Sequence, residues 1–241
     1  MKGKQVLATA IFLGVLGGLQ AAATRPDATL ETQLTKRLRD ANFDSISAEV
    51  TGQTAVLTGT VDRLSKAERA YRIARKTDGV RTVNNRIEVR SSREDADIAR
   101  DLTHEIRVFP FYDIFDLVTG EVRDGVVTLR GAVRLPQRFN DYANLAKNVG
   151  GVKSVVNELE VLPASSYDDQ IRWRVARAVY GSSALGPRYA VQALPPVHVI
   201  VKNGNVRLEG VVRTQLDKQL AERAARFAAT YFGLENNLKV A

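Results

Sequence analysis

The chain has 241 residues, of which 44% are hydrophobic and 26% are charged, a composition typical of globular rather than disordered or fibrous proteins. It contains no cysteine, which excludes a disulfide, a thiolate zinc site and the acylated cysteine of a bacterial lipoprotein. The formal net charge of +8 at pH 7 favours an anionic partner but does not identify it.

The N-terminal residues have the three parts of a secretory signal peptide. Lys2 and Lys4 precede an apolar run over residues 6–19, which is followed by alanines that suit cleavage. An uncleaved membrane anchor is the alternative, but an anchor needs about 20 apolar residues, and glycines interrupt this run. We therefore expect residues 1–23 to be cleaved, which predicts a periplasmic protein without a lipid anchor.

The first unit after this segment is predicted to begin with a helix and to end with a strand. Its first helix has a leucine at every fourth position, at Leu30, Leu34 and Leu38, which is typical of an amphipathic helix. Two strands follow, and then a second helix at residues 64–77. That second helix is strongly basic and carries Lys66, Arg69, Arg72, Arg75 and Lys76.

The same order of elements occurs three times along the chain. The glycine-centred strand AVLTGTV at residues 55–61 returns as VTLRGAV at 127–133 and as VRLEGVV at 206–212. The closing strand of the first unit, GVRTVNNRIEV, returns as GVKSVVNELEV and, shortened, as GLENNLKV. A helix-period segment separates the two strand motifs in each copy. A repeat of this length is a small domain rather than one turn of a solenoid.

The repeats therefore predict an α+β protein of three tandem small domains, at residues 27–91, 92–163 and 164–241. Each domain is expected to be helix-strand-strand-helix-strand, with a three-stranded mixed sheet packed by two helices. Units of this size have a marginally stable core, so we expect them to pack on one another. The first and third units are net basic, whereas the middle unit is net acidic.

Each glycine-centred strand has its glycine at the same point, at Gly59, Gly131 and Gly210. Because side chains alternate along a strand, each glycine shares a row with the leucine two residues before it. Glycine inside a strand usually marks a bulge or the close approach of another element. We interpret these glycines as structural, at the place where a helix lies close on the sheet.

An aromatic loop is predicted in the middle unit, between its first helix and its first strand. It contains Phe109, Phe111, Tyr112 and Phe115. These side chains either complete the small core of their domain or form a tip that contacts a membrane or a partner protein. The core interpretation is favoured, because small domains recruit loop aromatics to finish their cores.

The first helix of the third unit is the most informative stretch for function. Its expected core stripe is Ile171, Val175, Ala178 and Val179. On the opposite side are Trp173, Arg177 and Tyr180, flanked by Arg172 and Arg174. Tryptophan and tyrosine favour the headgroup level of a membrane, and arginine pairs with phosphate, so this side is a candidate lipid-binding face. The alternative is that it packs against another repeat, with arginine stacked on tryptophan.

No catalytic, cofactor or metal site is recognisable in the sequence. His104 and His198 lie in different units, where a lone histidine is more often structural than catalytic. Asp168 and Asp169 precede a helix, where acidic residues serve as caps. The asparagines of the closing strands are expected to tie strand to helix or loop: Asn85, Asn157 and Asn236. We therefore expect a protein that is not an enzyme and has no cofactor.

At these strand motifs the chain resembles the BON family, which comprises bacterial osmotically inducible periplasmic and nodulation proteins. The resemblance rests on the Leu-x-Gly-x-Val strand, the helix after it and the closing Gly-Val-x-x-Val-x-Asn-x-(Ile/Leu)-x-Val strand, in fixed order three times. The third copy departs from the pattern by a long loop before its first strand and by a shortened closing motif. The resemblance implies a non-enzymatic envelope module associated with phospholipid binding and stress tolerance.

Two functions are consistent with these observations. The first is binding of anionic phospholipid at the envelope, with Arg172, Arg174 and Arg177 on lipid phosphates and with Trp173 and Tyr180 in the interface. It fits the basic charge and the expected export, which makes nucleic acid a poor partner. The second is a periplasmic protein-interaction or holdase module, whose repeat surfaces and aromatic loop bind envelope or client proteins.

Overall fold

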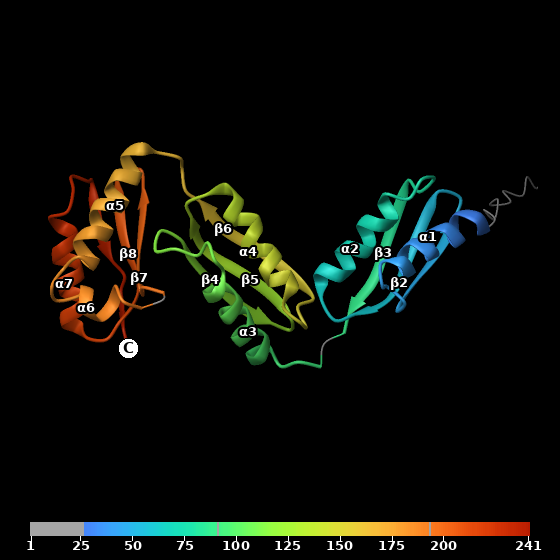
Figure 1. The fold of residues 1–241 in the computed structure, drawn as a ribbon, viewed down its shortest axis with the longest axis horizontal. Helices are drawn as coiled ribbons and strands as arrows, with labels where there is room; N and C mark the ends of the chain where they lie inside the picture. The colour runs from blue at the N-terminus through green and yellow to red at the C-terminus, as the bar shows by residue number, and fades with distance from the viewer. Residues whose placement is uncertain (1–26, 91, 193) are drawn as a thin grey trace, which may run out of the picture.

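The computed structural model describes residues 27–90, 92–192 and 194–241, so the predicted signal peptide lies outside the described residues. The described chain forms three small α+β domains arranged in a row, which confirms the predicted fold class (Figure 1). Within these ranges, none of the helices is long and apolar enough to cross a membrane.

Each domain has the expected order of elements. The first contains α1 (Ala28–Asp40), β1 (Ile46–Thr51), β2 (Thr54–Val61), α2 (Leu64–Arg75) and β3 (Thr82–Val89). The second contains α3 (Asp95–Val108), β4 (Leu117–Arg123), β5 (Val126–Val133), α4 (Pro136–Asn148) and β6 (Ser154–Val161). The third contains α5 (Ser166–Tyr180), a short α6 (Gly186–Tyr189), β7 (Val197–Lys202), β8 (Asn205–Val212), α7 (Gln215–Arg226), β9 (Gly233–Asn236) and β10 (Lys239–Val240).

The glycine-centred strand lies in the middle of each sheet. β2, β5 and β8 pair antiparallel with the strand before them and parallel with the strand after the second helix. This mixed pairing follows from the connections, because a tight hairpin joins antiparallel neighbours and a helical crossover joins parallel ones. In the third domain both β9 and β10 pair with β8, so the closing strand is split in two.

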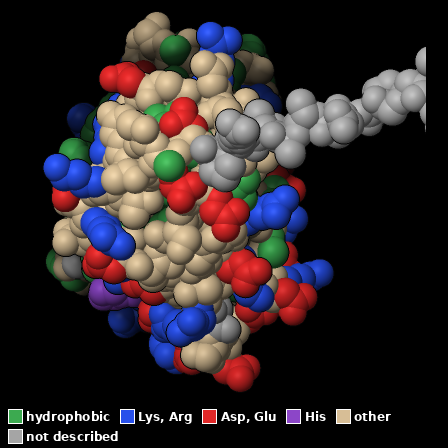
Figure 2. All heavy atoms as spheres, turned by 90° about the vertical axis from the view of Figure 1, so that its right-hand side faces the viewer, with side chains coloured by type: hydrophobic (Ala, Val, Ile, Leu, Met, Phe, Trp, Pro, Cys, Tyr) green, Lys and Arg blue, Asp and Glu red, His purple; other side chains and the backbone are tan. Residues whose placement is uncertain are grey.

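The helices of each domain cover one face of its sheet and leave the other face free of its own helices (Figure 1). The leucine row of the repeat is fully buried under these helices in all three domains, at Leu57, Leu129 and Leu208. At the end of the molecule formed by the first domain, acidic and basic side chains are interspersed over the surface (Figure 2). Charge therefore does not single out that end as a binding face.

The repeat glycines are structural, but the predicted close approach of a helix is wrong. The φ angles of Gly59, Gly131 and Gly210 are +129°, +128° and +117°, values that residues with a Cβ atom rarely adopt. A Cβ atom at any of them would fall within 3.0 Å of a backbone carbonyl oxygen at the start of the neighbouring antiparallel strand. The element that requires glycine is therefore strand backbone and not a helix.

In the second and third domains an aspartate on the first helix holds the β-hairpin. Asp95 accepts hydrogen bonds from the backbone N–H groups of residues 124–125 at 2.6 and 2.9 Å. Asp168 accepts from those of residues 203–204 at 2.9 and 2.8 Å. Asp168 and Asp169 were expected to cap α5, but neither is its N-cap residue. The N-cap is Ser165, whose side chain accepts a hydrogen bond from the backbone N–H of Asp168. Asp168 thus ties the helix to the sheet.

The asparagines of the closing strands tie strand to helix in two of the three domains. Asn157 Nδ2 donates to the carbonyl oxygen of Phe139 in α4 at 2.7 Å. Asn236 Nδ2 donates to the carbonyl oxygen of Lys218 in α7 at 3.0 Å. In the first domain, Asn85 Oδ1 accepts at 3.2 Å from a backbone N–H two residues further along its own strand. The predicted tie therefore holds for the second and third copies.

Candidate functional site

Three side chains of α5 form an exposed surface, which we call the Trp–Arg face: Trp173, Arg174 and Arg177. Trp173 is 61% exposed, and both arginines are exposed beside it. Within the described part of the chain, neither arginine forms an ion pair or a side-chain hydrogen bond. The face therefore combines one aromatic ring with two cations that remain available to an anion.

Arg172 was expected at the edge of this face, and that expectation is wrong. The residue is only 1% exposed. Its Nη1 pairs with Asp169 at 2.6 Å, and its Nη2 donates to the carbonyl oxygen of Val201 in β7 at 2.5 Å. A buried guanidinium is tolerated because these partners offset its desolvation. Arg172 therefore ties α5 to the sheet and is not available to a lipid phosphate.

Tyr180 is also occupied within its own domain. Its hydroxyl donates to the carbonyl oxygen of Val197 at 2.5 Å and accepts from the N–H of the same residue at 2.8 Å. Burial raises the pKa of Tyr180 above its ordinary value, and the ring packs against the core of the third domain. The residue fixes the end of α5 to the start of β7, so the prediction that it sits in a membrane interface is also wrong.

Phe115 of the aromatic loop lies against Trp173, although it belongs to the second domain. The two ring centroids are 4.8 Å apart with an interplanar angle of 73°. Phe115 is 3% exposed and is part of the core of the third domain. Arg134 Cζ lies 6.0 Å from the Phe115 ring centroid. The Trp–Arg face therefore lies at the junction of the second and third domains, exposed on one side and supported by a neighbouring repeat on the other.

The other aromatic residues of the loop are divided between core and surface. Phe109 and Tyr112 pack around Tyr142 of α4, with ring centroids 5.4 and 6.4 Å from its own. Phe111 is 59% exposed, and an arginine of α4 stacks on it. The core interpretation thus describes Phe109 and Tyr112, while Phe115 serves the neighbouring domain and Phe111 remains at the surface.

The aromatic loop also covers the free edge of the third sheet. The carbonyl oxygen of Ile114 accepts a hydrogen bond from the N–H of Val199 in β7, the edge strand, at 2.8 Å. Pairing an edge in this way protects it from adding a foreign strand. The open faces of the two sheets meet as well, through an apolar cluster of Ala132, Leu162 and Ile200 and an ion pair between Lys202 and Glu160.

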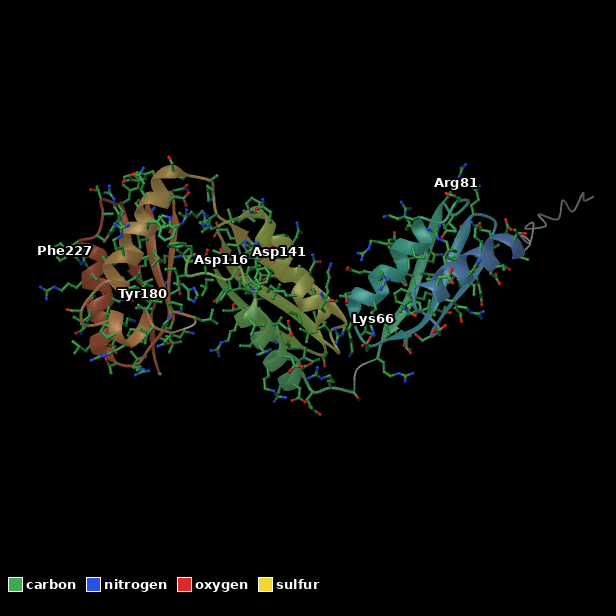
Figure 3. The ribbon with its side chains drawn as sticks, viewed as in Figure 1. Lys66, Arg81, Asp116, Asp141, Tyr180 and Phe227 are labelled. Carbon is green, nitrogen blue, oxygen red and sulfur yellow. The ribbon has the colours of Figure 1, made fainter. Side chains whose placement is uncertain are left out.

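Two buried titratable groups at this junction had no distinguishing signal in the sequence. Asp116, on the side of the second domain that faces the third (Figure 3), accepts from Arg134 N at 2.7 Å and from the Tyr142 hydroxyl at 3.3 Å. Burial raises the pKa of Asp116 to about 6. His198 Nε2 lies 3.3 Å from the Tyr112 hydroxyl, and burial lowers the pKa of His198. Asp116 is therefore held within its own domain, whereas His198 contacts the aromatic loop of the neighbouring domain.

The two histidines do not lie together. His198 is buried at the domain junction, while His104 is exposed on α3. In the ranges that the structure describes, no group of three or more histidine, aspartate or glutamate side chains could hold a metal ion. His198 therefore belongs to the packing of the junction, whereas His104 faces solvent.

A family model described as "BON domain" matches the chain three times, at residues 26–91, 95–163 and 168–241. The chain belongs to the BON domain family. Each match contains one helix-strand-strand-helix-strand unit, so the three BON domains account for almost all of the described structure.

Individual relatives cover smaller parts of the chain or resemble it only remotely. Osmotically-inducible protein Y of Escherichia coli (strain K12) is 33% identical over 124 residues, which are 48% of this chain and 61% of that protein. The match thus spans less than two thirds of that relative. Two solved structures of CdsD, a structural protein of the type III secretion system of Chlamydia trachomatis, cover 88% of this chain and 97% and 93% of their own. They are 13% and 14% identical with a TM-score of 0.25, which supports no conclusion about this chain.

Proposed function

We propose that this BON-domain protein acts without catalysis at the bacterial envelope in osmotic stress, and that it binds anionic phospholipid surfaces. The three BON domains and the similarity to an osmotically inducible protein support the stress role. The single observation that carries the lipid role is the exposed Trp173 beside two unpaired arginines. Tryptophan partitions to the headgroup level, and guanidinium groups bind phosphate with charge-assisted hydrogen bonds.

The proposed contact is the Trp–Arg face and not the whole of α5. Trp173 enters the interface while Arg174 and Arg177 bind lipid phosphates beside it. Phe115 limits the movement of the indole ring, because the two rings pack edge to face. Holding an aromatic side chain in place before binding reduces the conformational entropy that binding would otherwise cost.

Trp173 is the only tryptophan in the sequence, so its fluorescence reports directly on this contact. The chain beginning at Thr24 would be mixed with vesicles of increasing anionic fraction, and binding followed by fluorescence and co-sedimentation. We expect a blue shift that grows with anionic lipid and fades with salt, because ions screen exposed charges over about 10 Å at 0.1 M. No shift and no sedimentation would contradict the proposal.

The charge requirement has a matched control. Each basic residue near an anionic membrane contributes about 1 kcal/mol, so Arg174→Gln with Arg177→Gln should weaken vesicle binding roughly 30-fold. The control is Arg81→Gln with Arg86→Gln, which removes the same charge from two exposed residues of the first domain. Equal weakening in the two variants would mean that net charge, and not the Trp–Arg face, determines binding.

A second candidate function is the retention of unfolded envelope polypeptides. Phe227 and Phe232 of the third domain are each 80% exposed, and exposed apolar surface of this kind suits an extended apolar segment. Replacing both phenylalanines with serine should then reduce binding to unfolded outer-membrane polypeptides. Client binding that is indifferent to lipid, together with an unchanged Trp173 spectrum on vesicles, would favour this function over the first.

A further inference from the structure

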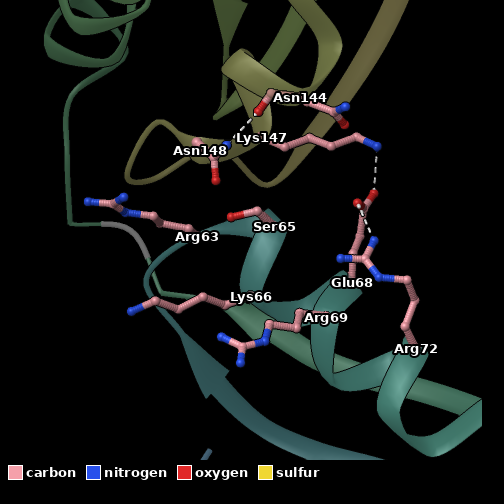
Figure 4. Close-up of a pocket in the computed structure, with 9 residues that line it drawn as sticks. All are labelled: Arg63, Ser65, Lys66, Glu68, Arg69, Arg72, Asn144, Lys147 and Asn148. Atoms are coloured by element: carbon pink, nitrogen blue, oxygen red, sulfur yellow. Dashed lines mark hydrogen bonds and ion pairs between the residues drawn. The ribbon is translucent and has the colours of Figure 1, made fainter. Parts of the chain in front are cut away.

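A second cationic surface lies between the first and second domains, away from the Trp–Arg face. There α2 and α4 pack side by side and line a cleft of about 450 Å³ (Figure 4). Four cations of the lining come from α2 and its N-cap residue and one from α4, and a single acid faces them: Arg63, Lys66, Arg69, Arg72 and Lys147, with Glu68. The lining is therefore strongly net positive.

The basic residues of α2 form a row that the repeat does not require. Lys66, Arg69, Arg72 and Arg75 recur at every third position. Residues three apart are neighbours on a helix surface, so like charges at this spacing repel and destabilise the helix. The equivalent helices α4 and α7 have no such row. The row occurs in one copy only, so the shared fold does not explain it.

Glu68 balances only part of this charge. Its carboxylate pairs with Lys147 Nζ across the domain boundary at 2.8 Å and lies 4.0 Å from Arg72 Nη1 (Figure 4). Lys66 pairs with Asp62 at the rim of the cleft at 2.7 Å. Within the described residues Arg69 has no carboxylate partner, and its guanidinium lies over a phenylalanine ring. Arg69 and Arg72 are thus the cations with most capacity left for a ligand.

The start of α2 adds hydrogen-bond donors to the same cleft. No side chain caps this helix, and its first turn contains no acidic residue. The first N–H groups of a helix carry partial positive charge and favour anions. Ser65 in that turn and Asn148 from α4 also line the cleft (Figure 4). The cations are therefore accompanied by neutral donors from both domains.

We propose that this cleft binds a phosphate group, or two adjacent phosphates, carrying at least two negative charges. Arg69 and Arg72 hold it from α2, and Lys147 holds it from α4. The anion takes over the bridging role of Glu68, so its binding also fixes the first domain on the second. The proposal is independent of lipid binding at the Trp–Arg face, because the two surfaces lie at different domain junctions.

Pyrophosphate is a suitable probe, titrated by calorimetry into the chain beginning at Thr24. Each charge-assisted hydrogen bond contributes about tenfold in affinity, so Arg69→Gln with Arg72→Gln should weaken binding by about 100-fold. The matched control is Arg81→Gln with Arg86→Gln, since Arg81 lies at the opposite end of the first domain from Lys66 (Figure 3). Equal losses in both variants, or no binding to the unaltered chain, would overturn the proposal.

The variant Glu68→Gln tests whether the cleft is an anion-binding site. If it is, the variant should bind pyrophosphate more tightly than the unaltered chain. Removing this carboxylate frees Lys147 and Arg72 for the ligand, and affinity for pyrophosphate should rise roughly tenfold. A fall in affinity in this variant, with the fold retained by circular dichroism, would show that Glu68 organises the cleft for something other than an anion.

Two further experiments identify the source of the phosphate and distinguish the cleft from the Trp–Arg face. Short-chain phosphatidylglycerol, kept below the concentration at which it forms micelles, competes with pyrophosphate if the cleft takes a lipid headgroup, and does not compete if it takes a free phosphate. Trp173→Ala should leave pyrophosphate binding unchanged. If this variant abolished it, the binding observed would belong to the Trp–Arg face and the cleft proposal would fail.

Discussion

Replacing Gly210 with alanine should strongly destabilise the third domain. At φ +117°, a residue with a Cβ atom has a strained backbone, which costs about 1–2 kcal/mol. The new methyl group would also fall within 3.0 Å of the Pro196 carbonyl oxygen, and inserting a methyl group into a packed site costs about 1–3 kcal/mol. The free energy of unfolding of this domain should therefore fall by about 2–5 kcal/mol.

Urea unfolding followed by Trp173 fluorescence measures this change, because the only tryptophan lies on α5 of the same domain. The signal isolates one domain of a chain whose three domains need not unfold together. Val211→Ala is the control, since the neighbouring side chain is exposed and its loss should cost no more than about 0.5 kcal/mol. A Gly210→Ala loss below about 1 kcal/mol would refute the backbone argument. If adding Ala221→Gly on α7 restored the stability lost in Gly210→Ala, the glycine would be required by the close approach of a helix after all.

Two buried titratable side chains give further predictions: Asp116 of the second domain and Arg172 of the third. Burial raises the pKa of Asp116 from 3.8 to about 6, so the stability that its proton confers is complete below about pH 4 and is lost as the pH rises through 6. Asp116→Asn should flatten that fall in the melting temperature measured by circular dichroism, and an unchanged pH profile would contradict it. Arg172→Gln should lower the free energy of unfolding of the third domain by about 1–3 kcal/mol, by removing its bonds to Asp169 and Val201. Vesicle binding per folded molecule should stay the same, whereas weaker vesicle binding at an unchanged urea midpoint would return Arg172 to the lipid site.

The element order and the buried rows could be predicted because they depend on local periodicity. Leu34 follows the helical period, and Leu57 and Leu129 follow the strand period; all three are fully buried as expected. These patterns are set by which face of an element meets the core, and three copies of the pattern reinforce one another. The structural role predicted for the repeat glycines was also correct. The physical reason for that role is the backbone of a neighbouring strand, and the pattern of a single strand does not contain it.

The errors fall where one element is covered by another that is distant in the sequence. The helical period placed Arg172 at the flank of α5, but the buried side of this helix also includes Ala176 and extends to Arg172 because β7 supplies a carbonyl acceptor there. Similarly, the aromatic composition of the loop does not distinguish Phe109, which completes its own core, from Phe115, which enters the next domain. Only the packing of whole domains decides between these environments.

The net acidic charge of the second domain does not neutralise either proposed anion site. Five of its twelve acidic side chains form ion pairs within the domain: Glu121 and Glu158 with Arg130, Asp97 with Arg100, Asp101 with Arg93, and Asp141 with Arg138. Glu160 pairs with Lys202 on the open face of the third sheet, on a different element from the Trp–Arg face.

Among the described residues, Arg174 and Arg177 of α5 and Arg69 of the α2–α4 cleft have no carboxylate partner and are left for external anions. Because these cations are exposed, added salt weakens their attraction for phosphate, whereas an uncharged osmolyte does not screen it. The proposed contact of Trp173 with a membrane is apolar in part, so salt should weaken it less than it weakens phosphate binding in the cleft. A rise in osmolarity caused by salt should thus release the cleft ligand before the lipid, and the same rise caused by sugar should release neither.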